Sequence, residues 1–142
     1  MTTLPAIRHT FTLNIPIDRV WNAIATSEGL DAWLMPNNFV PLIGGKFQFQ
    51  STPMGPWDGV VHCRVLDLKK PRRLVISWRV LADYETKLSF GLEEKDGQTQ
   101  VTITHDGWDN IPFELIGVRN MLELGWKQHA QQQLAEYLEE HK

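Results

Sequence analysis

Two of the five histidines are the residues of this sequence best placed for chemistry in an apolar interior. His105 alternates in step with Ile103, and His129 lies one helical step after Trp126, so both are predicted to face inward. Such a histidine can orient a ligand through a hydrogen bond or act as a general base. We favour the alternative, a satisfied histidine that closes the sheet end or caps Asp106, because polar groups inside cores are normally paired. Neither histidine has a third ligand at a suitable spacing, so no metal site is predicted.

Cys63 is the only cysteine, and it would be a nucleophile only with a base beside it to lower the pKa of its thiol. It shares a predicted strand face with Val61 and Val65, which is more typical of packing. A single cysteine forms no intramolecular disulfide and fits a reducing compartment, so we expect a cytoplasmic protein. The carboxylates that could form an acid–base group all stand at predicted turns or helix starts, where carboxylates cap backbone amides: Asp31, Asp58, Asp106 and Asp109.

No catalytic or cofactor motif is present. The sequence has no Gly-x-Ser-x-Gly elbow, no His-Glu-x-x-His, no phosphate-loop lysine and no dinucleotide-binding glycine pattern, so no catalytic residue and no cofactor is predicted. The formal net charge of -3 gives no basic field for a phosphate backbone, which argues against nucleic acid as a partner. No run approaches the roughly 18 apolar residues of a membrane span, and the first residues have no secretory pattern.

The six tryptophans divide into two kinds. Trp21 and Trp78 lie within periodic segments and are predicted core residues. The others lie beside loops or on the closing helix: Trp33, Trp57, Trp108 and Trp126. Large, rigid apolar side chains at such positions either line the mouth of a cavity or plug the ends of the sheet. Apolar residues also occur in the neighbouring loops, which suggests an entrance or a partner surface: Met35, Phe39 and Met54.

The elements that position these residues follow from periodicity. A first strand over 8–15 precedes two short helices, at about 17–24 and Glu28–Leu34. A run of alternating segments with hairpin turns, including Asp96-Gly97, then predicts an antiparallel meander with one buried face. From Asn110, the predicted cap ahead of Pro112, a helix with an apolar stripe is predicted to extend to about Glu140, with a bend expected at Gly117 and Gly125. The 142 residues suit one α+β domain spanning 1–142.

From about His9 to Glu139, the sequence resembles the activator-of-heat-shock-ATPase homologue family. The resemblance rests on an ordered set of segments: Val20-Trp21-Asn22-Ala23-Ile24 with Leu30 and Trp33, Gly44-Gly45-Lys46-Phe47-Gln48-Phe49, Asp58-Gly59, Val65-Leu66-Asp67 with Pro71-Arg72-Arg73-Leu74 and Trp78, Thr99 to Thr104 with His105-Asp106-Gly107-Trp108, and Gly125-Trp126 before Tyr137-Leu138-Glu139. It implies the START-like, Bet v-like helix-grip (SRPBCC) fold. That fold has a curved antiparallel sheet of about six to seven strands, two short helices and a long C-terminal helix over a hydrophobic cavity. It also implies binding of a small lipid-like or aromatic molecule.

The sequence departs from the family pattern at positions that bear on the ligand. Cys63 stands where members often carry glycine, and a side chain there would narrow the cavity. The last helix has Ala130 and Gln133 where leucine is frequent, which frees room and offers an amide to a ligand.

We therefore expect binding of a small hydrophobic molecule between the sheet and the closing helix, without catalysis, by a protein that is a monomer. The expected lining residues are Trp33, Met35, Phe39, Phe49, Trp57, Cys63, Trp78, Phe90, His105, Trp126, His129 and Gln133. One alternative is a cyclase- or hydratase-type enzyme that uses His105 or His129 as acid–base. Another is a chaperone-ATPase co-factor, a role made less expected because the named activators carry an additional N-terminal domain that this sequence does not include.

Overall fold

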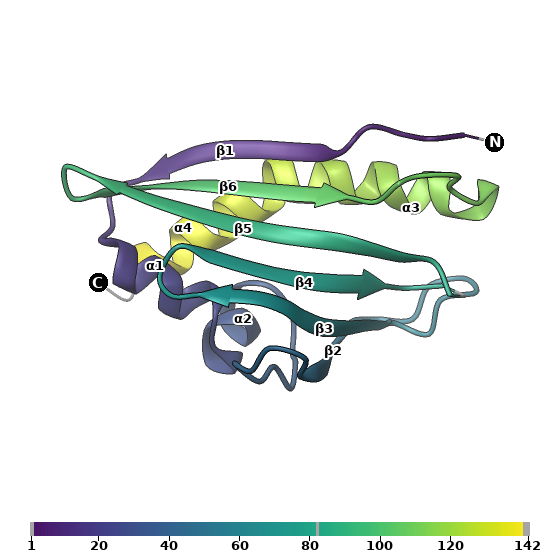
Figure 1. Cartoon of the computed structure of the whole chain (residues 1–142), viewed down its shortest axis with the longest axis horizontal. Helices are drawn as coiled ribbons and strands as arrows, with labels where there is room; N and C mark the ends of the chain where they lie inside the picture. The colour runs from purple at the N-terminus through teal and green to yellow at the C-terminus, as the bar shows by residue number, and fades with distance from the viewer. Residues whose placement is uncertain (1, 82, 141–142) are drawn as a thin grey trace.

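Alternating apolar and polar residues build a sheet whose apolar face turns toward three helical segments. The computed structural model describes residues 2–81 and 83–140. It contains one antiparallel sheet in the order β1-β6-β5-β4-β3-β2, with the helices lying behind it (Figure 1). The strands are β1 Ile7–Leu13, β2 Lys46–Gln50, β3 Val60–Lys69, β4 Arg73–Arg79, β5 Glu85–Lys95 and β6 Gln98–Asp106. The predicted α+β helix-grip fold is confirmed, with six strands in the described residues.

The central hairpin shows how the alternation sets the core. Leu88 and Phe90 of β5 stand opposite His105 and Ile103 of β6, and all four side chains are fully or almost fully buried. The hairpin turns at Asp96 and Gly97, which have φ of 55° and 78°. Left-handed conformations at both turn residues match the right-handed twist of the strands, so the Asp-Gly signal is confirmed as a hairpin.

The two short helices connect β1 to β2, the strands at the opposite edges of the sheet. They are α1 Ile17–Ile24 and α2 Ser27–Trp33, the second within one residue of its predicted bounds at each end. The Thr26 hydroxyl caps α2 by accepting a hydrogen bond from the Gly29 backbone N–H at 3.0 Å. A Cβ on Gly29 would lie 2.5 Å from the Asn22 carbonyl oxygen, so glycine permits the close approach of the two helices.

The C-terminal helix is continuous but not regular. It comprises α3 Phe113–Leu124, a π-helical segment η1 Gly125–Ala130, and α4 Gln131–Glu140. The predicted cap at Asn110 is wrong, because Asn110 adopts a φ of 50° in a turn and its backbone N–H bonds the Thr3 hydroxyl at 3.2 Å. Extended Pro112 flanks the first helical residue instead. Within the described residues, no helix is long and apolar enough to cross a membrane.

Candidate ligand-binding site

His105 is the centre of a buried hydrogen-bond chain. Its Nδ1 accepts a hydrogen bond from Trp126 Nε1 at 3.0 Å, and because an indole N–H only donates, the ring proton resides on Nε2. Nε2 lies 2.7 Å from Thr86 Oγ1, which in turn donates to the Trp78 carbonyl oxygen at 3.1 Å. Burial, and to a lesser degree the charge of Arg119, lowers the pKa of His105 to about 3. The imidazole is therefore neutral at physiological pH, and both ring nitrogens are engaged within the protein.

Trp78 connects the His105 hydrogen bonds to the aromatic core. Its ring centroid is 5.7 Å from that of Phe49, 5.5 Å from His105 and 5.6 Å from Trp126. The side chain is 3% exposed, yet its Nε1 is buried with no hydrogen-bond partner among the described residues. A buried donor left unpaired has a substantial desolvation cost, which marks this position as unusual.

An apolar cavity of about 430 Å³ opens beside Trp78. Its walls come from α3, from the end of β4, from the connection after α2 and from the loop between β2 and β3. The loop is held in shape by paired Met54 and Trp57 backbone hydrogen bonds, both 3.0 Å, and by Trp57 Nε1 donating to the Val60 carbonyl oxygen at 2.8 Å. The lining residues are Met35, Met54, Gly55, Pro56, Trp57, Val61, Trp78, Val80, Leu81, Glu114, Val118, Met121 and Leu122.

A smaller side cavity of about 150 Å³ adjoins the first. The two share four lining residues: Met35, Trp78, Met121 and Leu122. The π-helical segment contributes Trp126, His129 and Ala130 to the side cavity, and Gln133 follows from α4. An extra residue in a helical turn re-aims the side chains around it, and such turns often occur at functional sites. Here the segment brings the small, buried Ala130 to one cavity wall, whereas His129 borders the cavity but is exposed, so the prediction that it faces inward is wrong.

The structure brings six of the twelve expected lining residues to these two cavities: Met35, Trp57, Trp78, Trp126, His129 and Gln133. The other six line neither cavity and are buried in the core: Trp33, Phe39, Phe49, Cys63, Phe90 and His105. Aromatic contacts enclose several of them: Trp33 meets Phe90 edge-on at a centroid distance of 6.3 Å, and Phe47 packs edge-on against Phe39 and Phe49 at 5.0 and 5.5 Å. Trp33 also donates its indole N–H to the Ala23 carbonyl oxygen at 2.7 Å.

Sequence reasoning did not assign the α3 wall of the cavity. Val118 and Leu122 belong to the apolar stripe of the closing helix, so the stripe itself identified them as facing inward. Met121 is 60% exposed and Glu114 lies in the first turn of α3, and neither has a periodic signal. Only the docking of α3 against the β2–β3 loop reveals that they border a cavity.

Cys63 has the environment of a packing residue. Its Sγ lies 3.8 Å from the Val61 carbonyl oxygen. Burial, together with the Glu85 carboxylate, raises the pKa of the thiol far above its usual range, so the nucleophilic thiolate is suppressed. Across residues 2–81 and 83–140, no group of three His, Cys, Asp or Glu side chains is arranged to hold a metal ion.

Comparison with known proteins places this fold and site in a family. The family described as Activator of Hsp90 ATPase homolog 1-like protein matches residues 14–139. The chain belongs to that family. This confirms the resemblance found in the sequence, although no curated protein matches the chain.

Three solved structures of similar proteins each match nearly the whole chain. BH1534 of Bacillus halodurans is 31% identical over 94% of this chain and 99% of its own, with a TM-score of 0.75. MLL2253 of Mesorhizobium loti has a TM-score of 0.83 at 19% identity, covering 97% of this chain and 99% of its own. PFC0360w of Plasmodium falciparum, described as an HSP90 activator, has a TM-score of 0.75 at 19% identity, covering 94% and 95%. The last two likenesses establish the fold alone.

Proposed function

We propose that this protein binds a small apolar molecule in the apolar cavity between α3, the β2–β3 loop and the end of β4. The observation that carries the proposal is the cavity itself. Its volume of about 430 Å³ lies within the range of roughly 300–1,000 Å³ found for small-molecule sites. Its lining includes a single ionisable side chain, Glu114. Burial of a ligand's apolar surface would supply most of the binding free energy.

Access to the cavity is provided by flexible apolar side chains at its rim. Met54 is 59% exposed and Met121 60% exposed, although both line the cavity. Exposed apolar side chains gathered at a concave site are typical of ligand entrances. Methionine adapts its shape readily, so these two residues suit ligands of somewhat different outline.

The charges favour a neutral ligand with a hydrogen-bond acceptor. A carboxylate ligand would meet the Glu114 carboxylate and no cation in the apolar cavity. Trp78 lines the same cavity and its buried indole N–H has no protein partner among the described residues, so a ligand oxygen that reached this N–H would satisfy it. Because this N–H is buried, a ligand atom reaches it only if the neighbouring side chains move.

Binding without chemistry is the simplest function for these groups. Both nitrogens of His105 are engaged, and Cys63 remains a thiol. His129 and Glu114 line different cavities, so they do not form an acid–base pair across one ligand.

The proposal is tested by filling the cavity. Val118→Phe adds volume at a half-buried position that lines the cavity, while Leu124→Phe makes a similar change on α3 at a 49% exposed position outside it. Titrating a chemically broad set of apolar molecules while following tryptophan fluorescence should give saturable quenching for wild type and Leu124→Phe. Val118→Phe should show no saturable quenching. A flat response in all three proteins, or equal binding by Val118→Phe, contradicts the proposal.

A second candidate function is contact with a chaperone ATPase. It is favoured by membership of the family and by the description of PFC0360w as an HSP90 activator. Adding the purified protein to a purified chaperone of this kind should then accelerate ATP hydrolysis. Unchanged hydrolysis rates across a range of protein concentrations would exclude this role.

A further inference from the structure

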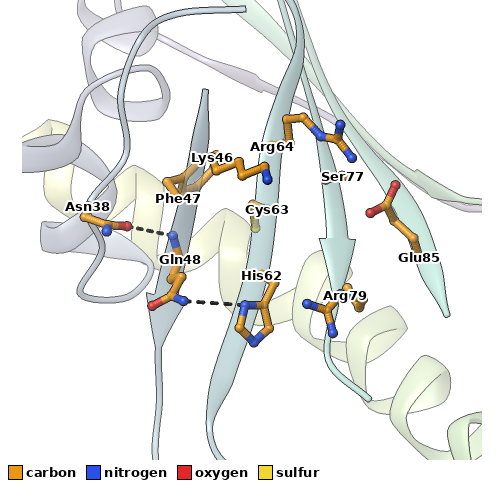
Figure 2. A pocket seen from close by; sticks show the side chains of 10 residues that line it. All are labelled: Asn38, Lys46, Phe47, Gln48, His62, Cys63, Arg64, Ser77, Arg79 and Glu85. Carbon is orange, nitrogen blue, oxygen red and sulfur yellow. Dashed lines mark hydrogen bonds between the residues drawn. The ribbon is translucent and has the colours of Figure 1, made fainter. Parts of the chain in front are cut away.

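A second cavity, polar in character, lies on the outer face of the sheet, away from the helices (Figure 2). We call it the polar cavity; its volume is about 430 Å³. Side chains from four neighbouring strands surround it: Lys46, His62, Arg64, Ser77, Arg79 and Glu85. It shares no lining residue with the two apolar cavities and is independent of the function proposed above.

The charges around the polar cavity are unbalanced. Three cations, Lys46, Arg64 and Arg79, face one carboxylate, Glu85, which leaves a formal excess of two positive charges with His62 neutral. The whole chain has a net charge of -3, so this cluster is opposite in sign to the molecule that carries it. A local field of this kind attracts anions.

The strand register concentrates the positive charge. Lys46 of β2 stands directly opposite Arg64 of β3. Like charges in directly opposed positions destabilise a sheet. Among the described residues, neither side chain has a hydrogen bond or an ion pair that would offset this repulsion. A bound anion between them would remove the unfavourable term.

Ser77 adds a neutral donor at the floor of the cavity. It is 2% exposed, in a strand where the neighbouring Ile76 and Trp78 face the apolar core, so its side chain lies on the outer face. Its hydroxyl makes no hydrogen bond to another described residue. The hydroxyl oxygen is not among the fully buried side-chain atoms that lack a partner, so it is open to the cavity and can donate to a ligand or solvent oxygen there.

We propose that the polar cavity binds the phosphate group of a small soluble phosphomonoester. A phosphate dianion matches the excess of two positive charges, and its oxygens accept hydrogen bonds from guanidinium, ammonium and hydroxyl donors together. Figure 2 shows the Arg64 side chain extending from β3 over β4 and the Lys46 side chain reaching toward β3. The two cations thereby border the polar cavity on the outer face of the sheet, and Ser77 forms its floor.

Titration with inorganic phosphate and with phenyl phosphate tests the proposal. Amide NMR shifts should change saturably in β2, β3 and β4 at constant ionic strength, with chloride as the balancing anion. Arg64→Gln and Ser77→Ala should each bind about tenfold more weakly or worse, since each removes a hydrogen bond to a charged group. Lys95→Gln is the matched control, because Lys95 is an exposed residue at the far end of β5, opposite Gln98, and does not line the polar cavity.

Three results would overturn the proposal. They are shifts that chloride alone reproduces, equal weakening in Lys95→Gln and the two cavity variants, and binding only to phosphatidylcholine vesicles that contain phosphatidic acid. If Arg64→Gln does not fold, Lys46→Gln serves in its place, since removing one member of the like-charged pair should not destabilise the sheet. These variants should bind apolar ligands as wild type does. The test of the polar cavity is therefore independent of the test of the apolar cavity.

Discussion

The indole N–H of Trp126 donates to Nδ1 of His105 at 3.0 Å, which joins the π-helical segment of the closing helix to the end of β6. This one contact determines the histidine tautomer and leaves Nε2–H for Thr86. The most chemically suggestive residue in the sequence is thus a structural link between helix and sheet. Trp78 lines the apolar cavity, and His105 does not.

The His105 link should make stability depend on pH. Its folded-state pKa of about 3 lies below its ordinary value of 6.5, so as pH falls the unfolded chain binds the proton first. Stability from this residue is complete above pH 6.5 and is lost progressively toward pH 3. We expect a loss of about 2 kcal/mol between pH 7 and pH 5. Urea unfolding at several pH values measures it. His105→Gln, though less stable throughout, should show a shallower dependence, and an unchanged slope would contradict the assignment.

Trp78→Phe should have little effect on stability, or increase it slightly, because it removes a buried N–H that has no partner and retains most of the apolar volume. Trp126→Phe is the contrasting change, since it leaves the Nδ1 acceptor of His105 unpaired and should cost about 1–3 kcal/mol. Chemical denaturation of the two variants under the same conditions gives the comparison. Equal losses would show that the Trp78 N–H has a partner in solution.

Cys63 should react with thiol reagents only when the protein unfolds. Its burial and the raised pKa of its thiol suppress the thiolate in the folded state. Labelling with an aromatic disulfide reagent at pH 8 should be slow in buffer and rapid in denaturing urea. Fast stoichiometric labelling of the folded protein would mean that this strand opens locally.

Two glycines should respond oppositely to replacement by alanine. Gly29→Ala places a Cβ 2.5 Å from a backbone oxygen of α1, and should cost about 1–3 kcal/mol or more through overpacking. Gly117→Ala, on the exposed side of α3 with no atom within 4 Å of the added Cβ, should stabilise by about 0.5–1 kcal/mol. Thermal unfolding of both variants checks the helix packing at these positions. A stable Gly29→Ala protein would be inconsistent with the contact between α1 and α2.

The sheet could be predicted from the sequence because its signals are local. Alternation through Leu88, Phe90 and Leu92 and the Asp96-Gly97 turn are each contained within a few residues. The same periodicity gave the apolar stripe of the closing helix. The family resemblance and the alternation agreed on the fold because both depend on the same pattern of buried residues.

The site was less predictable because its contacts join distant parts of the chain. The partner of His105 Nε2 is Thr86, on a different strand, and nothing in the sequence around either residue indicates the pair. The glycines in the closing helix indicated a bend, but they did not indicate that the irregularity is a π-helical segment beginning at Gly125. Phe49 and Phe90 have the composition of cavity residues, yet they are enclosed by other aromatic rings.

Native mass spectrometry of the protein isolated from the cells that naturally make it tests the central claim most directly. Wild type and Leu124→Phe, expressed in those cells, should each carry a small apolar molecule that is released on denaturation, and Val118→Phe should carry little or none. If all three proteins have only the mass of the bare chain, or if Val118→Phe retains the same molecule in full, the apolar cavity is not the binding site.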